Sequence, residues 1–150
     1  MTKPFHLAPL QELSNLRLEQ ATRQLGQLIA GEQQASQRLE LLVQYRNEYQ
    51  AQFLAAAEKG LDLHRWRNYQ QFLAKIDSAI EQARAMVAAA RQRTSAGQKD
   101  WQDKRGKVKA FDTLAQRFRE RIAYEEARSQ QKLMDEHAAR FLKGAKEEEQ

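Results

Sequence analysis

Apolar side chains recur at alternating intervals of three and four residues along most of the chain, which is the spacing of a coiled-coil helix. Glu32 and Arg46 interrupt the first such stretch at a positions, and we expect both side chains to reach out to water. The pattern predicts a first helix over about residues 8–58. Its apolar a and d positions hold Leu18, Ala21, Leu25, Leu28, Ala35, Leu39, Leu42, Tyr49 and Phe53.

A second heptad pattern runs without a change of phase from Trp66 to Ile122. A seven-residue repeat kept over this length implies a left-handed supercoil. The a and d positions of this stretch hold Trp66, Tyr69, Leu73, Ile76, Ile80, Ala83, Val87, Ala90, Thr94, Gly97, Trp101, Lys104, Val108, Phe111, Ala115, Phe118 and Ile122.

The short segment "AEKGLDLHRW", residues 57–66, separates the two patterns. Gly60 is the expected C-terminal stop of the first helix, and Asp62 is the expected N-cap of the second. A turn of about residues 59–62 predicts an antiparallel hairpin in which the numbers of facing residues sum to about 122. The predicted fold is therefore an all-α, left-handed, antiparallel coiled-coil hairpin that forms one domain over residues 1–150.

The second helix is predicted to be the longer one, over about residues 63–143, with a frayed tail at 144–150. The heptad phase slips after Ile122, although the apolar residues further on indicate that the helix continues. The first helix should end opposite about residue 114, so the second is expected to overhang it. Phe118 and Ile122 would then lack an intramolecular partner, and such a stripe normally marks a binding surface, unless a dimer covers it.

The composition agrees with a long helical protein. Charged residues make up 30% of the chain and aromatic residues 8%, and both prolines lie within the first ten residues. Cysteine is absent, which excludes disulfides and thiolate metal sites. The N-terminal segment lacks the apolar core of a signal peptide, and no apolar run is long enough for a membrane span. We therefore expect a cytoplasmic protein.

Candidate catalytic chemistry is sparse. His6, His64 and His137 do not have the spacing of metal ligands, and no glycine-rich loop with Lys-Ser/Thr is present to bind a nucleotide. A two-helix rod also lacks the concave pocket that catalysis needs. We predict that the protein is not an enzyme and uses no metal or cofactor.

The middle of the chain is basic. Between Arg84 and Arg121 eleven Lys or Arg residues stand against four Asp or Glu, in a chain of net charge +5. This excess favours an acidic protein surface, a phosphate backbone or solubility alone. Base stacking needs exposed rings, whereas Trp101 and Phe111 occupy seam positions. We therefore predict that the chain does not bind nucleic acid. Nucleic-acid binding ranks third among the alternative functions.

Two aromatic residues, Tyr45 and Phe72, fall at g positions, off the seam. The g positions of both helices line the same flank of an antiparallel coil, so these rings should lie on one side together. Either they shield the seam or they belong to a partner-binding surface near the turn. With neighbouring residues they form what we call the flank strip, which consists of Arg38, Leu42, Tyr45, Tyr49, Phe72, Ile76, Ala79 and Ala83.

Four segments, found in this order around the predicted turn, resemble the flagellar FliJ family of the type III protein-export apparatus. They are "LVQYRNEYQ" (42–50), "RWRNYQQFLAKIDSAIEQ" (65–82), "KDWQDKRGKVKAFDTLAQR" (99–117) and "QKLMDEHAAR" (131–140). The resemblance implies a two-helix stalk similar to the central stalk of rotary ATPases. Such a stalk inserts its terminal end into the hexameric ring of the export ATPase and promotes the assembly and activity of the ring. It also contacts the membrane-embedded export gate, couples ATP hydrolysis to export, and can engage export chaperones.

The resemblance assigns the flank strip to the export gate, although some relatives differ at Arg38 and Ala83. It implies a chain that is monomeric when free and that meets the inner face of the cell membrane at the flagellar base only through its partners. The resemblance also implies that the chain takes part in flagellum biogenesis, motility and chemotaxis. The alternatives are the equivalent stalk of a virulence-type secretion system, or a generic coiled-coil scaffold or dimer. The residues expected to enter the ATPase ring, at the bare end, are Leu10, Leu13, Leu16, Phe118 and Ile122.

Overall fold

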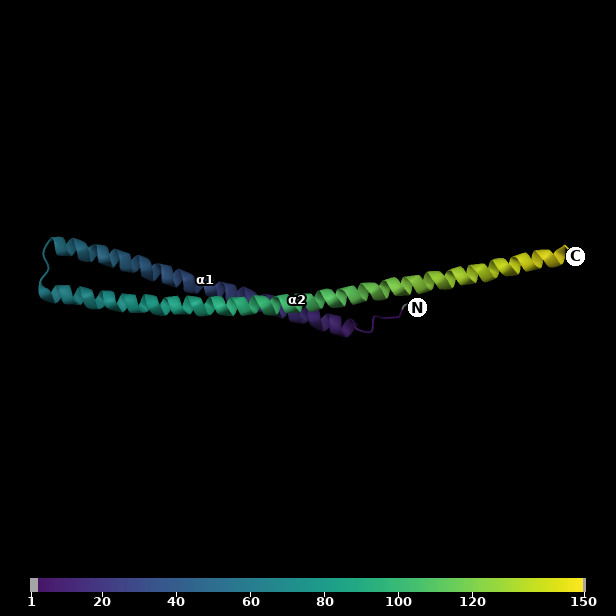
Figure 1. The fold of residues 1–150 in the computed structure, drawn as a ribbon, viewed down its shortest axis with the longest axis horizontal. Helices are drawn as coiled ribbons and strands as arrows, with labels where there is room; N and C mark the ends of the chain where they lie inside the picture. Colours follow the sequence, from purple (N-terminus) through teal and green to yellow (C-terminus); the bar gives the residue numbers. More distant parts are fainter. Residues whose placement is uncertain (1–2, 150) are drawn as a thin grey trace. The chain divides into compact units, whose positions relative to one another are not determined.

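The computed structural model describes residues 3–149, and these form two α-helices and no strand. Helix α1 comprises Ala8–Glu58 and helix α2 comprises Leu63–Glu148 (Figure 1). The all-α fold predicted from the sequence is confirmed, and so are both ends of α1 and the start of α2.

The C-terminal end of α2 differs from the prediction, because the helix continues to Glu148 instead of ending at residue 143. The frayed tail predicted at 144–150 followed from its terminal position, but its one glycine, Gly144, costs a helix only about 1 kcal/mol relative to alanine. Ala145 and Lys146 are good helix formers, and Lys146 lies in the last turn, where a positive charge favours the helix dipole. Gln150 lies outside the described residues.

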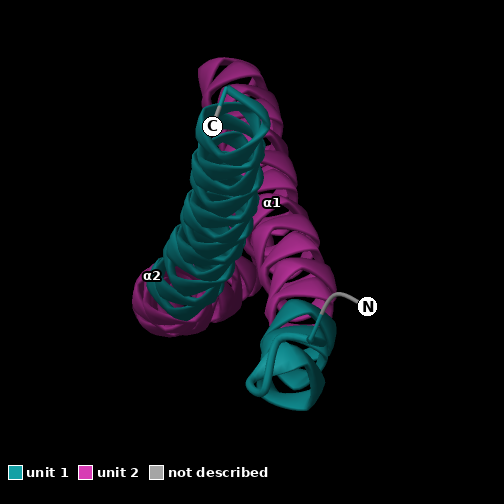
Figure 2. Cartoon of the chain, turned by 90° about the vertical axis from the view of Figure 1, so that its right-hand side faces the viewer, with its two compact units in different colours: residues 1–17, 105–150 teal, residues 18–104 magenta. Residues whose placement is uncertain are grey.

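The chain divides into two compact units (Figure 2). Residues 18–104 form the hairpin unit, and residues 1–17 with 105–150 form the terminal unit. Helix α2 contributes to both of them. The single domain expected from the sequence remains a prediction.

The turn of the hairpin unit is built as the sequence predicts. Gly60 has a φ of 94°, a left-handed conformation that residues with a Cβ rarely adopt, and its N–H donates to the carbonyl of Ala57 at 3.1 Å. The carboxylate of Asp62 accepts a hydrogen bond from the backbone N–H of Arg65 at 2.8 Å, which caps α2. These two local signals end one helix and start the next within four residues, 59–62.

Contacts across the hairpin show that the two helices are antiparallel. The Thr94 hydroxyl donates to the carbonyl of Leu28 at 3.3 Å, and the indole N–H of Trp101 donates to the Thr22 hydroxyl at 2.9 Å. The numbers of these paired residues sum to 122 and 123, which confirms the predicted register. Near the turn, the rings of Phe53 and Tyr69 are 5.3 Å apart, again with a sum of 122.

The seam of the two helices is made almost entirely of the predicted heptad positions. Among residues 3–149, Ser14 is the one buried residue outside the two predicted patterns, and it lies seven residues before Ala21, so the heptad of α1 begins one repeat earlier than expected. The seam prediction is therefore confirmed and extended toward the N-terminus. The buried residues are Ser14, Ala21, Phe53, Ile76, Ile80, Ala83, Val87, Ala90, Thr94 and Ala115.

The two charged residues at a positions are held by partners on α2. Arg46 forms a short hydrogen-bonded ion pair with Asp77, and Glu32 lies 3.7 Å from Arg91. Both side chains leave the seam, as predicted, but they are half-buried and end on a charge of the opposite helix instead of in water alone. Ion pairs with this much exposure contribute little to stability, typically about 0–1 kcal/mol.

Candidate partner-binding surfaces

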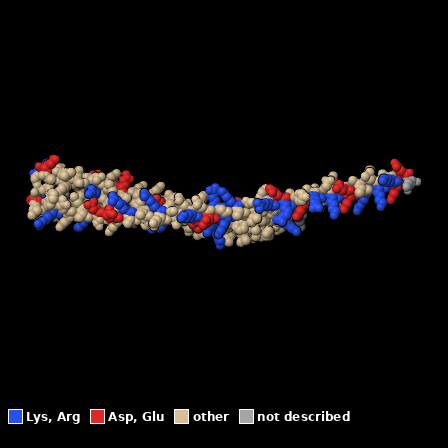
Figure 3. Space-filling view, viewed as in Figure 1, with Lys and Arg blue, Asp and Glu red and all other residues tan. Residues whose placement is uncertain are grey.

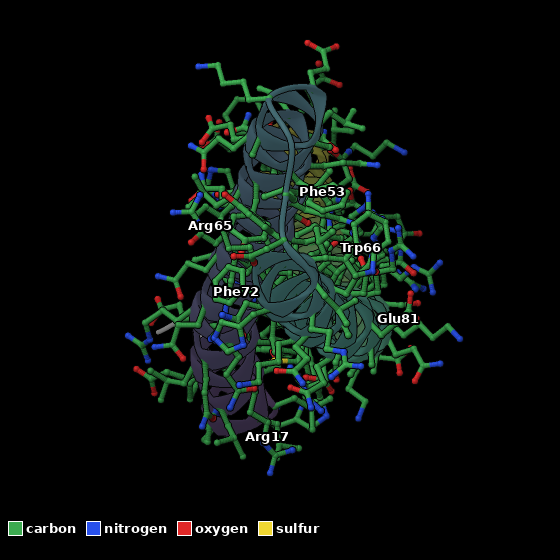
Figure 4. All side chains as sticks on the ribbon, turned by 90° about the vertical axis from the view of Figure 1, so that its left-hand side faces the viewer. Arg17, Phe53, Arg65, Trp66, Phe72 and Glu81 are labelled. Carbon is green, nitrogen blue, oxygen red and sulfur yellow. The ribbon has the colours of Figure 1, made fainter. Side chains whose placement is uncertain are left out.

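A cluster of aromatic rings joins α1 and α2 next to the turn. The ring of Phe72 lies 4.6 Å from that of Tyr49 and 6.2 Å from that of Tyr45, and Phe53 lies 5.1 Å from Trp66. In Figure 4, Phe72 and Trp66 project to opposite sides of the hairpin end. The heptad produces this separation, because Trp66 occupies an a position and Phe72 a g position.

The flank strip predicted from the sequence is partly exposed and partly buried. Tyr45 is 48% exposed and Phe72 is 36% exposed, whereas Ile76 and Ala83 retain only 5% and 4% of their accessible surface. Ile76 and Ala83 therefore belong to the buried seam in this structure, although the flank strip included them. Arg38 is exposed, and Leu42, Tyr49 and Ala79 are half-buried. The export-gate role of the strip stays a prediction.

Packing within the hairpin accounts for part of the position of Phe72 on the flank. Its ring rests on Tyr49, a seam residue, and meets Tyr45 edge-on at 81°. Aromatic pairs in such tilted and edge-to-face arrangements contribute about 0.5–1.5 kcal/mol beyond their buried area. Phe72 thus shields the seam and still offers part of its ring to a partner, so the two alternatives left open by the sequence are compatible.

Within this cluster, the pKa of Tyr49 is raised above its usual value. The main cause is burial of the phenol, which disfavours the phenolate, and the neighbouring hydroxyls of Tyr69 and Tyr45 add to it. Tyr49 is therefore neutral at physiological pH.

In the terminal unit, Phe118 has an intramolecular partner, contrary to the prediction. Its ring lies 5.4 Å from that of Phe5 and 6.3 Å from that of His6. The chain before α1 continues along α2 after the helix itself has ended, so the bare part of α2 starts later than the helix lengths alone imply. Ile122 is half-buried. The two residues are not an unpartnered stripe, and their proposed ring contact is untested.

The three leucines expected to enter the ATPase ring are exposed on α1. Leu10, Leu13 and Leu16 are each between 42% and 58% exposed, off the heptad that carries Ser14 and Ala21. The sequence therefore placed them correctly outside the seam. Their contact with a ring remains a prediction.

An exposed apolar surface near the end of α2 was not recognised as a candidate site from the sequence. Its large apolar members are 64–73% exposed. With His137 and Ala138 between them, these residues follow one another at intervals of three or four, a signal that was available but that served only to extend the helix. Together with His137 and Ala138 they line one shallow surface, which we call the C-terminal face: Leu133, Met134, His137, Ala138, Phe141 and Leu142.

The C-terminal face points away from the seam side of its own helix. At 3.6 residues per turn, its centre near Phe141 is rotated by about 120° from the side that carries Ala115, Phe118 and Ile122. The slip of the heptad phase after Ile122 is the cause of this rotation. A partner that packs along the side of Ala115, Phe118 and Ile122 would therefore not cover the C-terminal face.

The basic middle of α2 is not organised for base stacking. The indole of Trp101 is tied to Thr22 of α1, Phe111 is half-buried, and Lys104 lies 3.5 Å from Asp100. Figure 3 shows Lys and Arg interleaved with Asp and Glu on the face in view. The prediction that the chain does not bind nucleic acid stays a prediction.

Within residues 3–149 no helix has the length and apolar character to cross a membrane. No three His, Asp or Glu side chains in the same residues are grouped so that they could hold a metal ion. The absence of enzymatic activity remains a prediction from the sequence.

Comparison with known proteins gives a consistent result. The model of the family described as "Flagellar FliJ protein" matches residues 2–147. Two curated proteins, each named "Flagellar FliJ protein", come from Salmonella typhi and Escherichia coli strain K12. Each is 35% identical to this chain over 134 residues, which cover 89% of the chain and 91% of the relative.

Proposed function

The chain belongs to the flagellar FliJ family, and from that premise we propose that it is a non-enzymatic stalk of the flagellar type III protein-export apparatus. The stalk inserts its terminal end into the hexameric export ATPase, promotes assembly and activity of the ring, and contacts the export gate near the hairpin turn. It thereby couples ATP hydrolysis to protein export. The flagellar names of the relatives favour this function over the equivalent stalk of a virulence-type secretion system.

The exposure of the C-terminal face is the observation that best supports the proposed contact with the ATPase ring. A surface helix of a soluble protein rarely exposes large apolar residues in one contiguous patch unless a partner covers it. Leu133, Phe141 and Leu142 are each more than 60% exposed and share one side of α2. An apolar surface inside the ATPase ring could pack against this side of α2. Leu10, Leu13 and Leu16 of the same unit provide a second exposed apolar side on α1.

On this proposal the protein works in the cytoplasm, at the inner face of the cell membrane beneath the flagellar base. It reaches the membrane only through its partners and can engage export chaperones. The exposed parts of the flank strip, Arg38, Tyr45 and Phe72, support a gate contact because they combine apolar rings with a charge.

The proposed function is tested with the cognate export ATPase. The wild-type chain is expected to stimulate ring assembly and ATP hydrolysis. Phe141→Asp and Ala138→Asp should each weaken stimulation by about tenfold, because they place a charge in an apolar contact at a cost of about 1–3 kcal/mol. Ala139→Asp is the matched control, since it has the same helix propensity cost as Ala138→Asp but lies outside the C-terminal face.

Circular dichroism must show equal helicity for the three variants. Ring stimulation that is lost in Phe141→Asp and Ala138→Asp but kept in Ala139→Asp supports the proposal. A wild-type chain that changes neither hexamer formation nor ATP hydrolysis would refute it and would leave the scaffold alternative ahead.

A further inference from the structure

A second surface, in the middle of the hairpin unit, shares only Arg38 with the surfaces that the proposed function uses. A groove of about 520 Å³ runs between α1 and α2 on the flank that also carries the strip. Small residues make it possible, because Gly31, Ala35, Ala89 and Ala90 leave room where large side chains would meet. We call this surface the flank groove; it is lined by Gln27, Leu28, Gly31, Gln34, Ala35, Arg38, Met86, Ala89, Ala90 and Arg93.

The floor of the flank groove is apolar. Ala90 retains 4% of its accessible surface, and Leu28 and Ala35 are half-buried beside it. Met86 is 54% exposed at the edge, and its unbranched, polarisable side chain adapts to different apolar partners. A Cβ built on Gly31 would meet no atom within 4 Å, so the space above that residue is open.

The charges of the flank groove have one sign. Arg38 and Arg93 are its only charged residues, and no carboxylate lines it. Neither arginine forms an ion pair with another residue of the described range 3–149. By contrast, Arg46 and Arg91 are each paired across the helices. The groove is therefore an apolar trough with an unneutralised guanidinium near each end.

The spacing of the two arginines sets the geometry of an occupant. In the observed register, Arg93 lies level with about residue 29 of α1, so Arg38 is about nine residues further along. At 1.5 Å per residue this separation is about 13 Å. A helix lying in the groove presents residues seven apart on one side, about 10 Å from each other, and the long arginine side chains can span the remainder.

We propose that the flank groove binds an acidic amphipathic helix of a partner protein. Two carboxylates about seven residues apart pair with Arg38 and Arg93, and apolar side chains between them pack over Gly31, Ala35 and Ala90. Arg38 also belongs to the flank strip, so a helix in the groove continues along the surface that ends in Tyr45 and Phe72. This inference does not depend on the ring contact of the proposed function.

The test uses the full-length chain and a synthetic probe. The probe is a fluorescein-labelled helical peptide of alanine and glutamine, with two Glu seven residues apart and Leu three and four residues after the first. A matched peptide carries Lys in place of both Glu. Fluorescence anisotropy is expected to give a dissociation constant of about 10–100 µM for the Glu peptide, in the range of a small interface, and at least about tenfold weaker binding for the Lys peptide.

Two variants of the chain separate charge from shape. Arg38→Glu combined with Arg93→Glu should reverse the preference, so that the Lys peptide binds more tightly than the Glu peptide. Gly31→Leu fills the groove and should weaken the Glu peptide at least about tenfold. Gly26→Leu is the matched control, because it is the same change in the same helix, also in open space, but outside the groove. Both leucines are better helix formers than glycine, so the fold should persist.

Three results would overturn the proposal: no preference for the Glu peptide, no reversal by the double variant, or equal binding by Gly31→Leu and Gly26→Leu. An oligothymidine that binds as tightly as the Glu peptide, and that Gly31→Leu leaves unaffected, would show a general anion surface instead. Gly31→Leu should leave stimulation of the export ATPase unchanged, so failure of this inference and failure of the proposed function give different results.

Discussion

The seam can be tested by removing equal numbers of carbon atoms from a buried and an exposed position. Ile80 retains 4% of its accessible surface, whereas Leu41 is 66% exposed, and both lie in the hairpin unit. Replacing either residue by alanine deletes the same number of carbon atoms and improves intrinsic helix propensity. The two variants therefore differ in burial, which is the quantity under test.

The expected loss follows from the burial of Ile80. Each buried methylene-sized group contributes about 0.8 kcal/mol on transfer from water, so the truncation alone costs about 2.4 kcal/mol. The cavity left behind brings the cost to about 2–4 kcal/mol. Leu41→Ala should change the free energy of unfolding by no more than about 0.5 kcal/mol, as usual for a surface substitution.

The assay is urea and thermal unfolding followed by circular dichroism at a helical wavelength. For a chain of this size Ile80→Ala should lower the melting temperature by about 5–15 °C, with little change for Leu41→Ala. The midpoint in urea should fall without a change in slope. Equal effects of the two substitutions, or a larger effect of Leu41→Ala, would refute the seam register.

Three further predictions concern single contacts. Arg46→Leu should raise the free energy of unfolding by about 0.5–1 kcal/mol in urea, because apolar burial at a seam position outweighs the ion pair with Asp77; a loss of stability would contradict this. Phe5→Ala should speed amide exchange around Phe118 by about three- to tenfold, the kinetic equivalent of a lost ring pair, and unchanged exchange would mean that the contact does not form. The raised pKa of Tyr49 contributes stability that is fully present below the usual pKa near 10 and is lost as pH rises through the pKa of the folded state. Tyr49→Phe should therefore reduce the decline of the free energy of unfolding at alkaline pH, measured by urea titration.

The hairpin could be predicted from the sequence because its determinants are local and periodic. A heptad constrains which side of each helix is buried, and Gly60 and Asp62 limit the turn to four residues. With a turn that short, the register follows from the chain itself, and the Leu28–Thr94 and Thr22–Trp101 contacts agree with it.

Other features could not be read from the pattern. The contact of Phe5 and His6 with Phe118 involves a non-helical segment, which has no period that would place its side chains. The flank groove depends on what glycine and alanine leave empty between two helices, and a hydrophobicity pattern records no empty space. For the flank strip, the sequence predicted that Tyr45 and Phe72 lie together on one flank, but it grouped these exposed rings with Ile76 and Ala83, which are buried.

The distribution of large and small apolar residues separates stabilisation from recognition. The seam uses alanine at many of its most buried positions, including Ala21, Ala83, Ala90 and Ala115, although leucine there would bury more area. Small seam residues keep the helices close together and the hairpin narrow. Leu133, Met134, Phe141 and Leu142, which add nothing to the packing of the free chain, are left on the surface at a cost in solubility. Stability alone does not favour that arrangement, whereas a narrow stalk whose terminal unit is covered by a partner requires it.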